Sequence, residues 1–238
     1  MKITIVCNNI ICDEMLQTCW GFSSYIEGLE KTILFDTGSN GPILLANFEK
    51  LGLDVNDVDV VVLSHGHPDH TGGLKSFLEK NWNCAVCMPH AYLTSFKKLG
   101  AKNPKEIIPV NKPMKIYENV WTTGQLGIFR NDQALVIDSE KGLILITACS
   151  HAGIVKIVKR AKKIFKKNVY FLIGGFHLEY AWRPRIESVV KDLKKLEVEK
   201  VGPSHCTGEH AIDLFRQNWG DNFAKLGCGG IVEIPSKK

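Results

Sequence analysis

The sequence lacks any apolar run close to the roughly 20 residues that a membrane-spanning helix needs. It also lacks the features of a signal peptide, because residues 1–6 form a short alternating run without a small-residue cleavage site. We interpret this run as a first strand. The two absences predict a cytoplasmic protein with no membrane partner.

A strong charge imbalance and a linker are also missing. The net charge is +5, and 45% of the 238 residues are hydrophobic, which is ordinary for a soluble globular protein. The basic residues within 156–167 have helical spacing, so we interpret them as a solvated helix face rather than a phosphate-binding patch. Residues 1–238 are therefore predicted to form a single domain with no nucleic-acid partner, while the oligomeric state is left open.

A cysteine framework and a phosphate loop are absent. Among the eight cysteines only Cys84 and Cys87 form a CxxC pair, and they lie in an apolar run expected to be a strand. Residues three apart in a strand face opposite sides, and a zinc knuckle usually needs a second pair. Residues 37–41 carry glycines but no lysine of a nucleotide-binding loop. The cysteines are expected to be reduced thiols.

What the sequence does contain is an alternation of short strands and amphipathic helices, which predicts a layered α/β domain with helices outside and sheets inside. Strands are expected at 3–6, 22–26, 32–35, 58–63, 84–88, 114–117, 120–123, 134–137, 143–147, 169–173, 200–202 and 231–234. Helices are expected at 73–79, 91–99, 154–165, 186–196 and 211–217.

The clearest chemical signal follows the almost wholly apolar strand 58–63. His65, His67, Asp69 and His70 lie within six residues, so one loop carries four side chains that suit zinc, manganese or iron. His151 and His205 each follow another predicted strand and stand near a glycine. Because active sites of layered α/β folds gather at strand ends, we predict that these residues meet at a metal site.

The segment 64–73, Ser-His-Gly-His-Pro-Asp-His-Thr-Gly-Gly, resembles the signature of the metallo-β-lactamase superfamily. The resemblance implies its αββα sandwich, with one metal held by His65, His67 and His151 and a second held by Asp69, His70 and His205. It also implies that Asp36, in the segment 34–38, orients the ligand loop. One or two divalent transition-metal ions are expected, zinc before manganese or iron.

The blocks 149–154, 174–178 and 203–208 resemble a subgroup of metal-dependent hydrolases that includes a dihydropterin-ribofuranosylaminobenzene 5′-phosphate synthase. This implies a small-molecule substrate, such as a pterin or a phosphorylated aryl riboside. Metal-activated water would attack the substrate, and Asp69 is placed to accept a proton. The alternatives are a nuclease or phosphodiesterase of the same fold, or a metal-bound ligand sensor without turnover.

One departure from the family pattern concerns the bridging aspartate, which is missing after the strand 169–173. His177 follows that strand instead, and it either enters the site as a catalytic or ligand residue or only lines the pocket. A neutral imidazole cannot replace the carboxylate's negative charge, so the second ion should bind more weakly than the first. Cys149 and Cys206 flank ligand positions, and we interpret them as buried, inert thiols.

Overall fold

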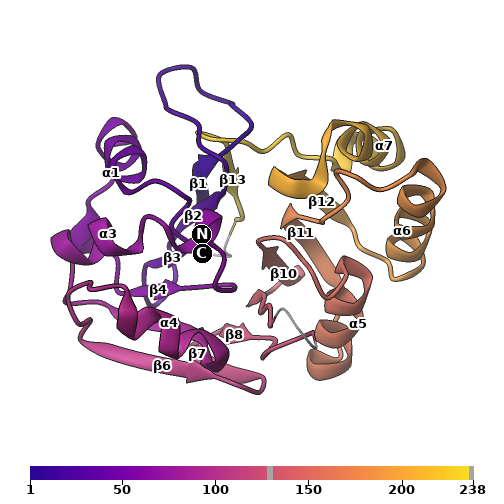
Figure 1. Ribbon diagram of the computed structural model, residues 1–238. Helices are drawn as coiled ribbons and strands as arrows, with labels where there is room; N and C mark the ends of the chain where they lie inside the picture. The colour runs from indigo at the N-terminus through magenta and orange to yellow at the C-terminus, as the bar shows by residue number, and fades with distance from the viewer. Residues whose placement is uncertain (128–130, 236–238) are drawn as a thin grey trace. The chain divides into compact units, whose positions relative to one another are not determined.

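The computed structural model describes residues 1–127 and 131–235, and the chain divides into two compact units (Figure 1). The first unit comprises Met1–Asn111 with Gly227–Lys238, and the second comprises Lys112–Leu226. Within the described residues, no helix is long and apolar enough to cross a membrane.

The first unit contains a seven-stranded sheet in the order β13-β1-β2-β3-β4-β5-β6. Strands β13, β1, β2 and β3 pair antiparallel, whereas β3 to β6 pair in parallel. The strands are β1 (Lys2–Asn8), β2 (Phe22–Glu27), β3 (Ile33–Phe35), β4 (Val60–Val62), β5 (Ala85–Pro89), β6 (Glu106–Val110) and β13 (Ile231–Glu233). The helices are α1 (Gly41–Lys50), α2 (Pro68–Thr71), α3 (Leu74–Lys80) and α4 (Leu93–Lys98).

A continuous apolar core joins this sheet to its helices. Val61 of β4 packs with Leu44 and Phe48 of α1 and with Phe77 of α3, and all four side chains are fully buried. The three valines of β4 are buried on both faces, as expected for a strand with parallel neighbours. This packing fixes the end of β4, from which the histidine-rich loop begins.

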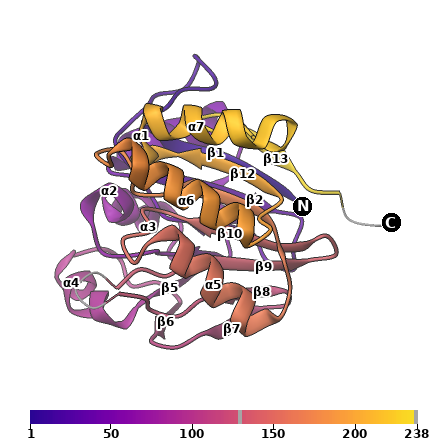
Figure 2. The ribbon, with the colours of Figure 1, turned by 90° about the vertical axis from the view of Figure 1, so that its right-hand side faces the viewer.

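The second unit contains a six-stranded sheet in the order β12-β11-β10-β9-β8-β7. Strands β10, β11 and β12 pair in parallel and the others antiparallel. The strands are β7 (Met114–Tyr117), β8 (Val120–Thr122), β9 (Leu135–Ser139), β10 (Gly142–Thr147), β11 (Val169–Gly175) and β12 (Lys200–Ser204). Helices α5 (Ile154–Phe165), α6 (Arg183–Lys195) and α7 (Glu209–Trp219) lie side by side (Figure 2).

Apolar side chains of these three helices form the core of the second unit with the sheet. Val158 of α5, Leu193 of α6 and Phe215 of α7 are all fully buried against Leu172 of β11. Lysines on the opposite face of α5 leave only its apolar stripe to pack, as the sequence pattern predicted. The strands β10, β11 and β12 are thereby held in register, with their carboxyl ends at the same edge.

Most predicted elements are present, but three were missed. Helix α2 carries Asp69 and His70 in a segment that was expected to be entirely a loop. Helix α1 begins after Asn40, whose side-chain oxygen accepts a hydrogen bond from the Ile43 amide at 3.0 Å. Pro42 in its first turn suits that position because no intrahelical partner for its nitrogen is needed there. Strand β6 escaped prediction because it carries Glu106 and Pro109 at exposed positions.

Candidate metal centre

The first unit places two loops of the motif at adjacent strand ends. Strands β3 and β4 are parallel neighbours, so Asp36, directly after β3, faces the segment that follows β4. The two oxygens of Asp36 accept hydrogen bonds from the backbone amide and the hydroxyl of Ser64, each at 2.6 Å. Asp36 is completely buried, and these bonds hold the start of the histidine-rich loop, in agreement with its implied orienting role.

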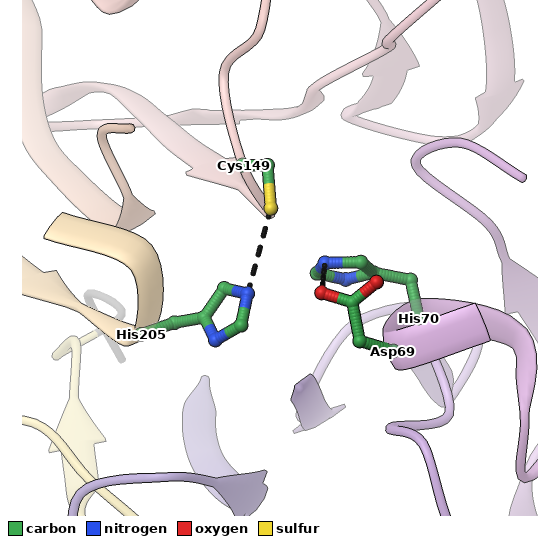
Figure 3. Close-up of side chains that lie close together, drawn as sticks. All are labelled: Asp69, His70, Cys149 and His205. Atoms are coloured by element: carbon green, nitrogen blue, oxygen red, sulfur yellow. Dashed lines mark hydrogen bonds and ion pairs between the residues drawn. The ribbon is translucent and has the colours of Figure 1, made fainter. Parts of the chain in front are cut away.

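His70 lies between two carboxylates. Its Nδ1 is 2.8 Å from Asp36 Oδ2, and its Nε2 is 3.2 Å from Asp69 Oδ2. Figure 3 shows the Asp69 carboxylate turned toward the His70 ring. Burial alone would lower the pKa of His70, but Asp36 and then Asp69 raise it to about 10. A histidine binds a metal ion only through its neutral imidazole, so metal binding at His70 would release a proton.

The other two histidines of the loop converge on His70. The His65 ring centroid is 4.4 Å from that of His70 and 4.5 Å from that of His67. Ser64 Oγ lies 2.8 Å from Nδ1 of His65 and positions that ring. The first unit therefore brings its four predicted ligands together. The Asp36 carboxylate contacts Nδ1 of His70, and the Ser64 hydroxyl contacts Nδ1 of His65.

In the second unit, His151 lies just beyond β10 and is held by Asp132. The carboxylate of Asp132 accepts a hydrogen bond from the His151 backbone amide, and its Oδ1 lies 3.0 Å from the ring Nδ1. Asp132 is 3% exposed, and the sequence analysis did not identify it. The only signal was an acidic residue just before the predicted strand 134–137, too common to be diagnostic.

His205 follows β12 in a short turn and meets Cys149. The Cys149 sulfur is 3.4 Å from Nε2 of His205, and both side chains are buried (Figure 3). Next to them, a hydrogen bond with Cys149, followed by contacts with His177 and His205, lowers the pKa of the Cys206 thiol. The sequence interpretation treated Cys149 as inert, whereas the structure directs its sulfur at a predicted ligand.

His177 lies beside His151, with ring centroids 4.6 Å apart, and its side chain is exposed. The position expected for a bridging aspartate cannot hold a side chain. A Cβ at Gly174 would lie 1.9 Å from the Thr147 carbonyl oxygen, and one at Gly175 would lie 2.0 Å from that of Ala148. The departure from the family pattern is therefore built into the backbone, while the catalytic role of His177 stays a prediction.

Left-handed backbone marks the candidate ligand segments. Asp36, Ser150, His177 and His205 have φ angles of 59°, 60°, 55° and 52°, although none is a glycine. Such angles cost free energy and persist only where surrounding contacts enforce them, which is typical of functional sites. Each of these residues lies just beyond the end of a strand. His205 is itself a predicted ligand, whereas Asp36, Ser150 and His177 are neighbours of one.

The donor groups fit a divalent transition metal. Imidazoles, carboxylates and a thiol suit zinc, manganese or iron, and a carboxylate hydrogen-bonded to Nδ1 fixes the tautomer that leaves Nε2 for a metal. Both units contain this arrangement, in the pairs His70–Asp36 and His151–Asp132. The assignment of individual ligands to individual ions stays a prediction.

Comparison with known proteins identifies the class. Residues 19–146, more than half of the chain, match the metallo-β-lactamase superfamily. The chain belongs to this superfamily of metal-dependent enzymes, and the predicted αββα fold class is confirmed.

Individual relatives show which members of the superfamily this chain is similar to. The chain is 32% identical over 265 residues to the 7,8-dihydropterin-6-methyl-4-(β-D-ribofuranosyl)-aminobenzene-5′-phosphate synthase of Methanocaldococcus jannaschii, and the match covers 90% of both proteins. The crystal structure of Tm1679, a metal-dependent hydrolase of the β-lactamase superfamily, matches with a TM-score of 0.86 and 27% identity over 99% of this chain and 100% of that one. Human tRNase Z, short form, matches with a TM-score of 0.66 over 99% of this chain and 100% of that one, but at 12% identity it shares only the fold.

Proposed function

We propose that this protein is a metal-dependent hydrolase, or a related transferase, that acts on a small molecule. One observation carries the proposal: each unit presents a candidate ligand histidine whose Nδ1 is held by a buried carboxylate. His70 is held by Asp36 at 2.8 Å, and His151 by Asp132 at 3.0 Å. Metal-ligating histidines nearly always have such a partner, whereas solvated surface histidines have no need of one.

The proposed ligands follow the family pattern residue by residue. His65, His67 and His151 would hold one ion, and Asp69, His70 and His205 would hold a second. When bound, such an ion polarises a substrate oxygen and lowers the pKa of water from about 15.7 to about 7. Zinc is the first candidate because imidazole and carboxylate ligands suit it.

The protein's own residues supply orientation and proton transfer. Asp36 and Ser64 hold the loop, so the His65 and His70 rings keep their directions without rearrangement during the reaction. The Asp69 side chain is 21% exposed, and one of its oxygens lies beside Nε2 of His70. It can therefore accept a proton from an incoming water or substrate group while staying in contact with the site.

The proposed substrate is a pterin or a phosphorylated aryl riboside. The named relative from Methanocaldococcus jannaschii makes a product that contains both groups, and its match covers 90% of each chain. Tm1679 is described as a hydrolase, so hydrolysis and group transfer both belong in the test. Transfer differs from hydrolysis only in the nucleophile that replaces water.

The experiment begins with the metal content of the purified protein. The metal-loaded protein is then assayed on a panel of phosphoesters, lactones and thioesters, and on an activated pterin offered with an aryl riboside 5′-phosphate. The combined change His65→Ala and His67→Ala should remove most of the metal and all turnover. The control is His90→Ala, because this exposed histidine belongs to no candidate ligand set.

Each outcome decides a part of the proposal. Unchanged metal in the double variant would overturn the ligand assignment. Bound metal without turnover on either panel would favour a ligand sensor. Turnover that needs the aryl riboside would identify the transferase form, and turnover with water alone the hydrolase.

A further inference from the structure

Two cysteines outside the candidate metal centre lie close together in the first unit. Cys7 is on β1, and Cys19 is in segment 9–21, the long loop that joins β1 to β2 (Figure 1). Both sulfurs lie beside Gly38, because a Cβ placed there would be 3.1 Å from Sγ of Cys7 and 3.5 Å from Sγ of Cys19. A hydrogen bond joins the two side chains, and both are free thiols.

The backbone keeps the two sulfurs near each other. The Cys19 amide donates a hydrogen bond at 3.3 Å to the carbonyl oxygen of Asn8, the residue that follows Cys7. Two residues after Cys19, Gly21 is packed so tightly that a Cβ there would lie 2.2 Å from the Asp69 carbonyl oxygen. Cys19 is therefore anchored on both sides, and its sulfur is held at a high effective concentration beside that of Cys7.

The surroundings of the two thiols differ in the way that a reactive pair requires. Cys19 is half-buried, and its pKa is lowered to about 6, first by the hydrogen bond with Cys7 and then by Ser39 and the Asn40 amide, which together outweigh burial. Cys7 is buried, and its hydrogen bond with Cys19 and its burial raise its pKa. At neutral pH, Cys19 is therefore the nucleophilic thiolate, and Cys7 keeps its proton beside it.

We propose that Cys19 and Cys7 form an oxidative modification site, at which hydrogen peroxide converts the two thiols into a disulfide. The Cys19 sulfur attacks a peroxide oxygen, so an S–O bond forms, the O–O bond breaks and hydroxide leaves. The Cys7 sulfur then attacks the sulfur of this sulfenic acid. The S–S bond forms, the S–O bond breaks, and the oxygen leaves as water with the Cys7 proton. The two sulfurs together lose two electrons, which reduce the peroxide.

Neighbouring thiols can also hold a structural metal ion, but such a site needs about four converging ligands. Within residues 1–127 and 131–235, the groups of three or more converging ligand-type side chains do not include Cys7 or Cys19. A third cysteine, Cys228, has its sulfur 3.2 Å from the Val6 carbonyl oxygen, and burial raises its pKa to about 12. The arrangement therefore favours disulfide formation over metal binding.

The test treats the purified protein, reduced and then freed of reductant, with a small excess of hydrogen peroxide at pH 7. The thiols counted after denaturation should fall by two from the eight of the sequence, and dithiothreitol should restore them. A protease that cleaves after Glu14 separates Cys19 from Cys7. Mass spectrometry should then find these two peptides joined by a disulfide.

Three variants identify the partners. Cys19→Ser should lose the disulfide. Cys7→Ser should instead accumulate the Cys19 sulfenic acid, which dimedone traps as a stable adduct. The matched control is Cys12→Ser, which removes an exposed cysteine from the peptide that carries Cys7 and should keep the disulfide. If the Cys7 variant does not fold, the peptide maps of the parent and of Cys12→Ser still decide the pairing.

The inference does not depend on the proposed function, because neither thiol is a candidate metal ligand and the measurement needs no turnover. A disulfide between Cys19 and Cys12 or Cys228 would overturn the pairing with Cys7. A thiol count that stays at eight, or oxidation confined to the other cysteines, would overturn the site itself.

Discussion

At the scale of single residues, the sequence identified candidate ligands better than the groups that hold them. His65, His67, Asp69 and His70 are conspicuous because their types and spacing are rare together. Asp132 is not conspicuous in the sequence. Its role depends on a contact with His151, which is 19 residues away and is brought close only by folding. The contact of the Cys149 sulfur with His205 likewise joins residues that are distant in the sequence, so only folding creates it.

Asp132 gives the first prediction. Asp132→Ala should lower metal affinity by about 10- to 100-fold, because His151 loses the partner that fixes its ring and tautomer. Calorimetric titration of metal into the stripped protein measures this. Asp138→Ala is the control, since that carboxylate makes only a partly exposed ion pair with Lys167. Equal metal affinities for the parent and Asp132→Ala would show that metal binding does not depend on the contact between Asp132 and the His151 ring.

Cys19 gives a prediction for pH dependence outside the candidate metal centre. A hydrogen bond with Cys7, together with contacts to Ser39 and the Asn40 amide, lowers the pKa of Cys19 to about 6, whereas burial raises that of Cys84 to about 11. The thiolate is the reactive form, so iodoacetamide should label Cys19 readily at pH 7.

The rate of this labelling should fall as the pH drops through about 6, because Cys19 then takes up its proton. Peptide mass spectrometry after a short pulse gives the rate at each pH, and Cys84 in the same sample serves as the unreactive reference. A rate for Cys19 that keeps rising steeply above pH 8 would mean an ordinary thiol pKa.

At the scale of elements, hydrophobic periodicity predicted the buried strands and the amphipathic helices well. Helix α5 matches its expected bounds because its apolar stripe and lysine-rich face repeat at 3.6 residues. Helix α1 was missed because an N-cap and an early proline mark only where a helix begins, and its apolar pattern is weak. Sheet order could not be predicted, since pairing such as β1 with β13 joins distant segments.

The glycine at the end of β11 gives an element-scale prediction. Gly174→Ala should lower the free energy of unfolding by about 2–4 kcal/mol, because a left-handed residue is strained and the new Cβ would strike the Thr147 carbonyl oxygen. Gly100→Ala separates the two causes. It has a φ of +64° but nothing within 4 Å, so about 1–2 kcal/mol is expected. Urea unfolding of both variants measures the difference, and equal losses would contradict the steric argument.

At the scale of the whole molecule, the sequence predicted the superfamily and its fold, because the central motif is specific and the order of elements matches. The division into two compact units was not foreseen, since no linker or change of composition marks residue 111 or 227. The interpretation as a single domain stays a prediction. All eight cysteines are free thiols in the structure, so titration under denaturing conditions should count eight.

Metal binding should stabilise the folded molecule as a whole, which provides the final prediction. The proposed ligands come from segments as distant as His65 and His205, and an unfolded chain cannot hold them in one geometry. A ligand that binds only the folded state adds about 2.7 kcal/mol at a free concentration 100 times its Kd. For a chain of this length that corresponds to a rise in Tm of roughly 5–10 °C. Scanning calorimetry of stripped and zinc-loaded protein should show this rise for the parent and for His90→Ala. The combined His65→Ala and His67→Ala variant should lose most of it, and an equal rise in that variant would place the stabilising metal elsewhere.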